Sequence, residues 1–107
     1  MMKFLSRPEE LVLLAVWRLK GNAYCVTIRK QVSEVSGKAW SFGAVYVPLH
    51  RLEKKGLLKS TYGPPTKVRG GRSKRYYELT PRGKKALADV RELHKAIWED
   101  VPNTSLE

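Results

Sequence analysis

The sequence predicts a mainly α-helical fold with one small β-hairpin. Two observations lead to this prediction: four segments combine helix-capping residues with apolar periodicity, and two short strand-like segments flank a stretch rich in Gly and Pro. The chain of 107 residues suits one domain with a modest core. Its hydrophobic content of 42% favours folding over disorder.

The first helix is predicted by signals at both of its ends. Residues 6–9 fit a capping box, so the helix is expected to run to about Lys20 and to end at Gly21. Its apolar residues cover nearly all sides, which indicates burial on more than one face. Leu11 and Leu14 are therefore expected to contact a second subunit.

A second helix is expected after Asn22, which can act as its N-cap. Gly37 closes this helix, and residues 38–40 form a short connector. The stripe expected to face the core comprises Tyr24, Ile28, Val32 and Val35.

Ser41 opens a third helix that extends to about Lys55 and ends at Gly56. Pro48 lies inside this segment and removes a hydrogen-bond donor, so it is expected to bend the helix or loosen its first turns. The inner face is expected to comprise Val45, Leu49 and Leu52.

Residues 57–62 and 72–79 are predicted strands of a hairpin with a long tip. Thr80 and Pro81 then start a fourth helix, expected to reach about Asp100. Spacing of the 4-3-4 type along this helix predicts a dimer seam. The seam comprises Ala86, Val90, Leu93 and Ile97, with Trp98 at its far end near its symmetry mate.

This order of elements is that of a winged helix-turn-helix module with one appended helix. We expect residues 1–79 to form a DNA-binding domain, residues 80–101 a C-terminal dimerisation helix and residues 102–107 a flexible tail. In such modules the second helix of the motif enters the major groove, and here that helix begins at Ser41.

The positive charge of the chain is concentrated in one region. The formal net charge is +11, and residues 51–85 contain twelve Lys or Arg and only two acids. A local basic field of this size favours double-stranded DNA as the partner. Two alternatives remain open: a solubilising surface, or a protein-interaction module on a winged-helix scaffold that binds an acidic partner.

Two segments resemble a known family. Residues 41–46 (SFGAVY) and 49–58 (LHRLEKKGLL) resemble the recognition-helix signature of the PadR family of bacterial transcriptional regulators. Residues 69–83 (RGGRSKRYYELTPRG) are similar to its wing and the start of the following helix. The resemblance, which extends over about residues 11–87, implies a homodimeric DNA-binding regulator, usually a repressor, with the C-terminal helix forming much of the interface. The two recognition helices of a symmetric dimer are expected to match an inverted-repeat site.

The sequence departs from the family pattern at two places. Tyr24 is followed by Cys25 where Tyr-Gly is frequent, and Val47 separates the helix tyrosine, Tyr46, from Pro48. Some family members are released from DNA by small ligands. An unidentified aromatic effector is therefore an open alternative for the tryptophans, which are otherwise interpreted as core or interface residues.

The candidate DNA contacts of the recognition helix, at about residues 41–55, each have a second reading. Tyr46 can contact a phosphate, a sugar or a thymine methyl, or can lie in the core. Ser41 can cap the helix, reach a phosphate, or both. Gly43 and Ala44 allow close approach either to the groove or to another helix.

His50 and Arg51 lie one turn beyond the tyrosine and are further candidates. Arg51 can contact a phosphate or pair with Glu34. His50 is not expected to bind a metal, because no cluster of ligand residues surrounds it in the sequence.

The basic wing, at about residues 63–75, supplies the remaining candidates. Two adjacent glycines permit a tight tip from which an arginine can enter a minor groove. Lys74 and Arg75 alternate sides of a strand, so only one of them is expected to face DNA. The wing candidates are Lys67, Arg69, Arg72, Lys74 and Arg75.

Other functional classes find little support in the sequence. We expect no enzyme, no metal and no cofactor, because the sequence offers no nucleophile–base pair, phosphate loop or metal-ligand cluster. Cys25 is the single cysteine and is expected to be a small buried hydrophobe. No apolar run approaches the ~18 residues of a membrane helix, so a cytoplasmic protein is expected.

Overall fold

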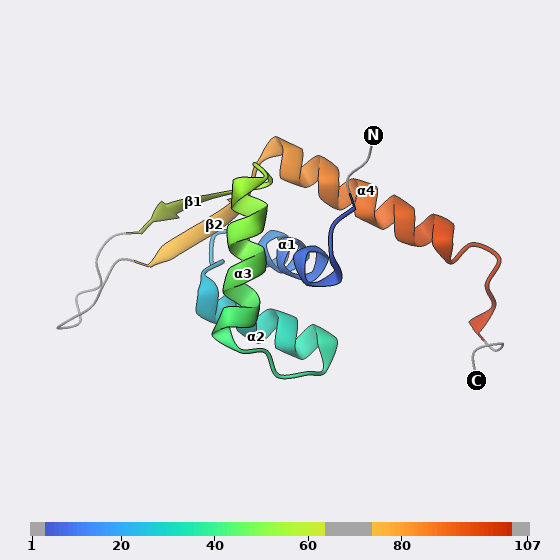
Figure 1. The fold of residues 1–107 in the computed structure, drawn as a ribbon, viewed down its shortest axis with the longest axis horizontal. Coiled ribbons are helices and arrows are strands. Elements are labelled where there is room, and N and C mark those ends of the chain that lie inside the picture. Colours follow the sequence, from blue (N-terminus) through green and yellow to red (C-terminus); the bar gives the residue numbers. More distant parts are fainter. Residues whose placement is uncertain (1–3, 64–73, 104–107) are drawn as a thin grey trace.

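The computed structural model describes residues 4–63 and 74–103. Three helices form a cluster, and a two-stranded hairpin and a fourth helix extend from it in opposite directions (Figure 1). This is the mainly α-helical winged helix-turn-helix arrangement predicted from the sequence. In chain order the elements are α1 (Arg7–Leu19), α2 (Cys25–Ser36), α3 (Phe42–Lys54), β1 (Leu58–Tyr62), β2 (Arg75–Leu79) and α4 (Pro81–Ile97).

Three of the four predicted N-caps are confirmed. Ser6 Oγ accepts a hydrogen bond from the Glu9 amide at 3.3 Å, and the Glu9 carboxylate accepts one from the Ser6 amide at 2.8 Å. The hydroxyls of Ser41 and Thr80 accept from the third amide of α3 and α4. Each cap satisfies a backbone donor that the helix itself cannot pair.

The prediction for the start of α2 is wrong. Its N-cap is Tyr24 rather than Asn22. Thr27 Oγ1 accepts from the Tyr24 amide at 3.0 Å and donates to the Asn22 carbonyl at 2.6 Å. The Thr27 side chain, at the third position of α2, therefore caps the start of this helix. Asn22 takes part only through its backbone carbonyl, which accepts from Thr27.

Two further expectations need correction. α4 ends at Ile97 rather than near Asp100, and the backbone enters the left-handed region three residues later, with φ of 64° at Asp100. Val35 is half-exposed at the edge of the contact between α1 and α2, although the periodicity predicts that it faces the core.

α3 runs as one α-helix past the buried Pro48.

One apolar core joins the helices and the hairpin. Val45, Leu49 and Leu52 form the inner face of α3, as predicted, and are fully buried. They pack in the same cluster as Val12 and Leu13 of α1. The buried side chains from the other elements are Ile28 and Val32 of α2, and Leu57, Leu58, Tyr77 and Leu79 of the hairpin.

The hairpin is antiparallel, and it is tied to the helices at its base. Its register pairs Leu58 with Leu79 at the base and Tyr62 with Arg75 at the outer end. The Tyr77 amide donates to the Ala23 carbonyl at 2.8 Å, so the connection between α1 and α2 extends the sheet edge. The direction in which the wing projects is therefore set by the helical core.

Cys25 is half-buried beside this core. Burial raises the pKa of its thiol, although the positive charge of Arg29 acts in the opposite direction. The thiol is thus protonated near neutral pH, as a small apolar side chain would be. No helix in the described part of the chain combines the length and apolarity needed to cross a bilayer.

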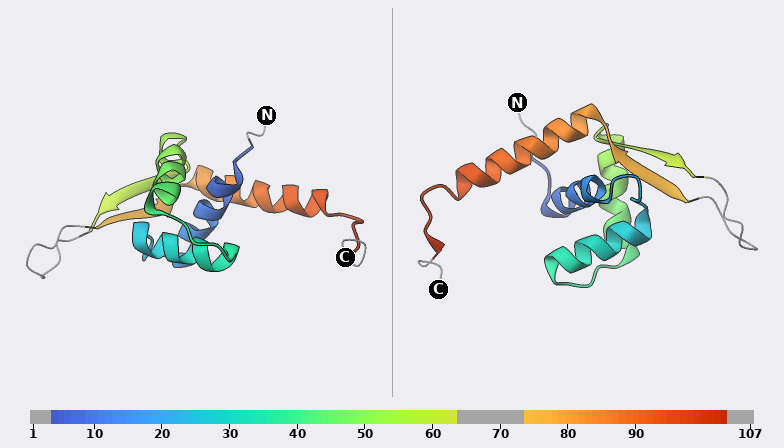
Figure 2. Two further views of the ribbon diagram at one scale, coloured as in Figure 1. Left: turned by 60° about the horizontal axis from the view of Figure 1, so that its bottom comes forward. Right: turned by 180° about the vertical axis from the view of Figure 1, so that it is seen from behind.

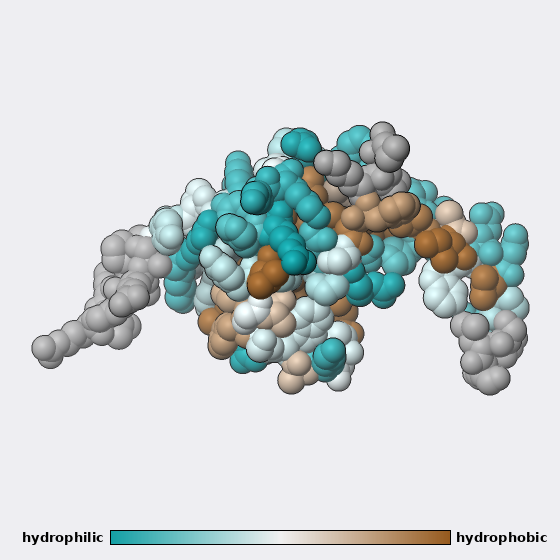
Figure 3. Space-filling model, viewed as in Figure 1, coloured by the Kyte–Doolittle hydropathy of each residue, from teal (hydrophilic) through white to brown (hydrophobic). Residues whose placement is uncertain are grey.

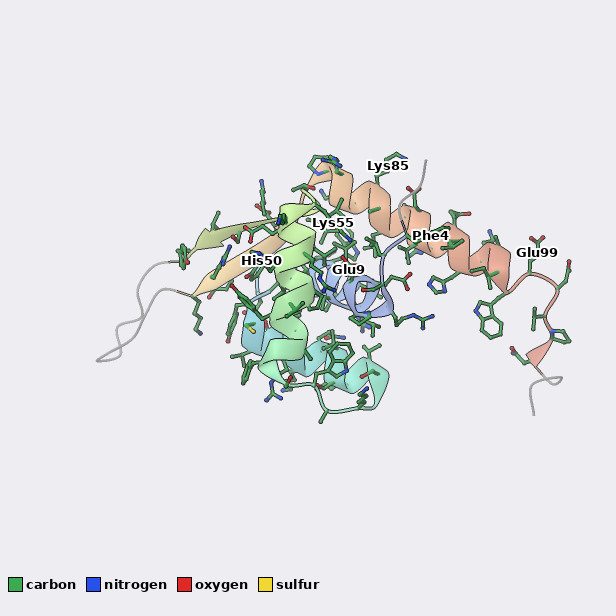
Figure 4. The ribbon with its side chains drawn as sticks, viewed as in Figure 1. Phe4, Glu9, His50, Lys55, Lys85 and Glu99 are labelled. Atoms are coloured by element: carbon green, nitrogen blue, oxygen red, sulfur yellow. The ribbon has the colours of Figure 1, made fainter. Side chains whose placement is uncertain are left out.

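An ion pair between a buried carboxylate and an exposed lysine joins α1 to the end of α3. The Glu9 side chain is 5% exposed, and its carboxylate accepts from Lys55 Nζ at 2.6 Å (Figure 4). Burial alone would raise the pKa of Glu9, but the hydrogen bonds from Lys55 and from the Ser6 backbone outweigh it and lower the pKa. Glu9 therefore favours folding in its ionised form.

We expect Glu9→Gln to cost about 1–2 kcal/mol of unfolding free energy at pH 7. Because the folded-state pKa is below the ordinary value of 4.5, the contribution is present above pH 4.5 and is lost as pH falls through the lower value. Urea unfolding at pH 7 and at several values below 4.5 measures both effects. Glu92→Gln on the exposed side of α4 is the control, and identical acid profiles for the two variants would contradict the assignment.

Candidate nucleic-acid interface

The outward side of α3 is open to solvent along its length. Gly43, Val47, His50 and Lys54 follow 4-3-4 spacing and therefore share one stripe, opposite the buried inner face. All four residues are exposed. A helix that presents such a stripe beside a hairpin has the geometry that helix-turn-helix proteins place in a major groove.

The first turn of α3 has small residues on this open side. Ser41 Oγ accepts from the Ala44 amide at 3.1 Å, so the hydroxyl caps the helix. A Cβ built on Gly43 would meet only Ser41 Oγ, at 4.0 Å. Close packing against the described residues therefore does not require a glycine at this position.

Tyr46 lies on the exposed side of α3 rather than in the core. It is 49% exposed, and its ring stacks on that of His50 with centroids 6.2 Å apart and planes at 14°. His50 and Arg51 are both exposed. The ion pairs among the described residues do not include one between Arg51 and Glu34, so that alternative is not realised.

Sequence reasoning missed two large apolar residues on this helix. Phe42 and Val47 are 49% and 47% exposed. The guanidinium of Arg29 lies 4.4 Å from the centroid of the Phe42 ring and also donates to the Trp40 carbonyl at 2.9 Å. The 4-3-4 stripe that starts at Gly43 could have identified Val47 from the sequence.

The two described wing cations have different surroundings. Arg75 turns inward: its Nη2 lies 2.6 Å from Glu53 Oε1, and its Nε donates to Ser60 Oγ at 2.9 Å. Lys74 is exposed, and its Nζ lies 4.5 Å from the centroid of the Tyr24 ring. Arg75 thus links β2 to α3, whereas Lys74 remains accessible to a partner.

The other wing candidates, Lys67, Arg69 and Arg72, lie outside the described residues. So does the Gly70-Gly71 pair on which the expectation of a tight tip rests.

Hydrophilic surface covers the C-terminal half of α3 and the adjoining strands, a hydrophobic group lies in the middle of the helix, and the surface over its first half is pale to hydrophobic (Figure 3). Three or more His, Cys, Asp or Glu side chains do not come together anywhere in residues 4–63 and 74–103 in a way that could hold a metal ion.

A second open surface lies along α4, which projects away from the helical cluster (Figure 2). A groove of about 490 Å³ separates α4 from α1, and a second groove of about 400 Å³ runs along its other side. His94 Nε2 lies 2.9 Å from Glu10 Oε1 and connects the two helices at the first groove. α4 therefore contacts the helical core along one face, and a mainly apolar groove lies open on each side of that contact.

The structure places the predicted dimer residues around these grooves. Leu11, Leu14 and Val90 line the first groove together with Trp17. The second groove is lined by Ala86, Val90 and Leu93. Ile97 and Trp98, at the end of α4, are 60% and 54% exposed.

Comparisons with known proteins agree with this geometry. The model of the transcriptional regulator PadR-like family matches residues 13–89. A transcriptional regulator of Mycobacterium tuberculosis is 39% identical over 59 residues, which are 55% of this chain and 51% of the relative. The chain thus spans about half the length of that curated relative.

Solved structures resemble the fold over nearly the whole chain. A PadR family transcription regulator from Clostridium difficile is 28% identical with a TM-score of 0.69, over 95% of this chain and 100% of the other. A PadR family regulator from Eggerthella lenta is 26% identical with a TM-score of 0.69, over 91% and 81% of the two chains. A PadR-like transcription factor from Bacteroides fragilis is 25% identical with a TM-score of 0.70, over 87% and 84%.

The resemblance noted in the recognition-helix and wing segments is thereby confirmed over most of the chain, and the relatives are transcription regulators rather than enzymes. From the fold, the exposed helix beside a hairpin and the family match together, we conclude that this chain belongs to the PadR-like family of transcriptional regulators.

Proposed function

We propose that the chain is a homodimeric repressor that binds an inverted-repeat DNA operator through α3 and the basic wing. The observation that supports this most directly is the uncovered outward side of α3 next to the exposed Lys74. A helix of this kind fits the major groove, and its first residues meet base edges. Such a regulator would act in the cytoplasm, where its DNA is.

The charge around α3 suits a polyanion. Arg51 and Lys54 are exposed on the helix. Glu53, the one acid of α3, pairs with Arg75 at 2.6 Å and adds little net negative charge. The resulting positive field would attract phosphates and speed encounter with DNA.

We assign different tasks to the candidate residues. The small residues Gly43 and Ala44 let the helix approach the groove, Ser41 presents the helix N-terminus to a phosphate, and Tyr46 and His50 make contacts inside the groove. The cations contact phosphates, except that Arg75 orients the wing through its ion pair with α3. The phosphate contacts we propose are Arg51, Lys67, Arg69, Arg72 and Lys74.

We assign dimerisation to α4, within residues 80–101, and DNA binding to residues 1–79. A helix with apolar grooves on both flanks buries them only against another molecule. In a two-fold dimer the recognition helices would lie about 34 Å apart, one turn of DNA. The two half-sites would then form an inverted repeat.

Selection of bound duplexes from a random pool, followed by titration at several salt concentrations, tests this function. We expect the selected duplexes to share an inverted repeat and their affinity to fall linearly with salt on logarithmic axes. Tight binding to an acidic protein, with no duplex bound in dilute buffer, would instead favour the protein-interaction module.

Lys74→Ala is expected to weaken binding to selected and unrelated duplexes alike, because a phosphate contact carries no sequence information. The slope of log affinity against log salt should decrease by about 0.9 for the lost contact. Lys95→Ala is the matched control, since it removes an exposed cation near the end of α4, which projects away from the hairpin (Figure 1). If the two variants gave equal slopes of log affinity against log salt, Lys74 would not contact a phosphate.

A further inference from the structure

Large apolar side chains lie exposed on the outward side of α3, among its cations. Val47 lies on the central stripe between Gly43 and His50, and Phe42 and Tyr46 lie one turn apart on its flank. These three apolar side chains are each nearly half-exposed. Single exposed apolar residues are common, but three within two turns of one helix indicate a contact surface.

Neighbouring side chains hold the two aromatic rings in place. Arg29 covers one face of Phe42 and is itself fixed by its hydrogen bond to the Trp40 carbonyl. His50 stacks on Tyr46. Rings restricted in this way lose little rotational freedom when a partner covers them, which favours their use in recognition.

The same part of the helix lacks the side chains that read bases by paired hydrogen bonds. Residues 42–49 contain no Arg, Lys, Asn, Gln, Asp or Glu. Those residue types make the bidentate contacts to guanine, adenine or cytosine. The apolar group that a base edge offers in the major groove is the C5 methyl of thymine.

The charge around the apolar residues favours DNA over an apolar protein as the occupant. Arg29 lies beside Phe42 at the start of α3, and Arg51 and Lys54 lie one and two turns beyond Val47. Lys74 lies exposed on the neighbouring hairpin. Glu53 is engaged by Arg75. A surface with an apolar centre and a cationic border matches a groove whose floor carries methyl groups and whose walls carry phosphates.

Resting on the DNA binding proposed above, we propose that α3 selects its operator by apolar contact between Val47, Phe42 and Tyr46 and thymine methyl groups in the major groove. At the base pairs that these three side chains contact, hydrogen bonds to bases then contribute little to the sequence preference. Half-sites should be rich in A·T pairs where the first two turns of α3 lie.

Replacement of single thymines by deoxyuridine tests this inference directly. Deoxyuridine keeps the base pair and the O4 acceptor but lacks the methyl group. In a duplex selected by the wild-type chain, each contacted thymine should lose about four-fold in affinity on replacement, as burial of one methyl-sized group predicts. Replacement of thymines outside the DNA segment that the protein covers should leave the affinity unchanged.

A variant identifies the side chain responsible. Val47→Ala should remove the preference for thymine over deoxyuridine at one position of each half-site and leave the others intact. Because Val47 is half-exposed, the variant is expected to fold, which circular dichroism checks. Val35→Ala, which shortens an equally exposed valine on α2, should keep the full thymine preference.

Two other outcomes separate this inference from the proposed function. Equal affinity for thymine and deoxyuridine duplexes, with steep salt dependence retained, would overturn methyl recognition while DNA binding stands. Absence of binding to every duplex in dilute buffer would overturn both.

Discussion

Gly83→Ala is expected to lose about 3 kcal/mol or more of unfolding free energy, or to fail to fold. Gly83 is buried at the third position of α4, and an added Cβ would lie 2.0 Å from the Leu57 carbonyl oxygen and 3.0 Å from its carbon. Both are backbone atoms, which cannot swing aside as the end of a side chain can. The Leu57 carbonyl also accepts from the Thr80 amide at 3.1 Å, so a shift would break this junction.

Gly43→Ala is the matched control for this effect. It makes the same replacement in the first turn of a helix, but there the new methyl meets open space. Alanine should therefore stabilise the fold by about 0.5–1 kcal/mol through helix propensity. Urea unfolding followed by circular dichroism compares the two variants, and equal midpoints would show that Gly83 does not mark a tight backbone contact.

Local signals in the sequence were sufficient to predict the order of elements. A hydroxyl followed by helix-forming residues marked Ser6, Ser41 and Thr80 as caps, because capping depends on residues within one turn. The inner face of α3 followed from its periodicity. These features require no knowledge of where distant segments lie.

Contacts between distant segments could not be predicted in this way. The partners of Arg75 include Glu53, 22 residues away, and Lys55 pairs with Glu9 across 46 residues. A charge pattern gives no information on such pairing until the fold brings the side chains together. For the same reason the charge pattern alone places Arg75 with the DNA contacts, although its ion pair with Glu53 turns it towards α3.

The exposed apolar residues of the site were missed for a related reason. Phe42 and Val47 were not among the candidates because apolar side chains are ordinarily assigned to the core. The structure shows that both lie away from it. A helical-wheel comparison with Val45 and Leu49 would have placed Val47 outside.

Val90→Glu is expected to convert the proposed dimer into a folded monomer and to lower operator affinity by about 10²–10⁴-fold. Val90 lines both grooves beside α4, so a carboxylate there would have to lose its water when a second copy docks, which costs free energy. The fold should survive, because the neighbouring Ala86 and Leu87 make the contacts of α4 with the core. When separate monomers bind the two half-sites, the operator affinity no longer includes the gain that comes from joining two DNA-binding units in one dimer.

Sedimentation and duplex titration measure these two effects on the same samples. Val90→Leu keeps the apolar contact and should remain dimeric with full affinity. Ile97→Glu supplies a second test at the exposed end of α4, where a charge cannot disturb the core of the monomer. Two results would contradict the assignment: both charged variants stay dimeric, or both become monomeric and keep their operator affinity. In either case α4 would not be the element that pairs the two recognition helices. The spacing of about 34 Å expected from a two-fold dimer would then have to be set by another interface.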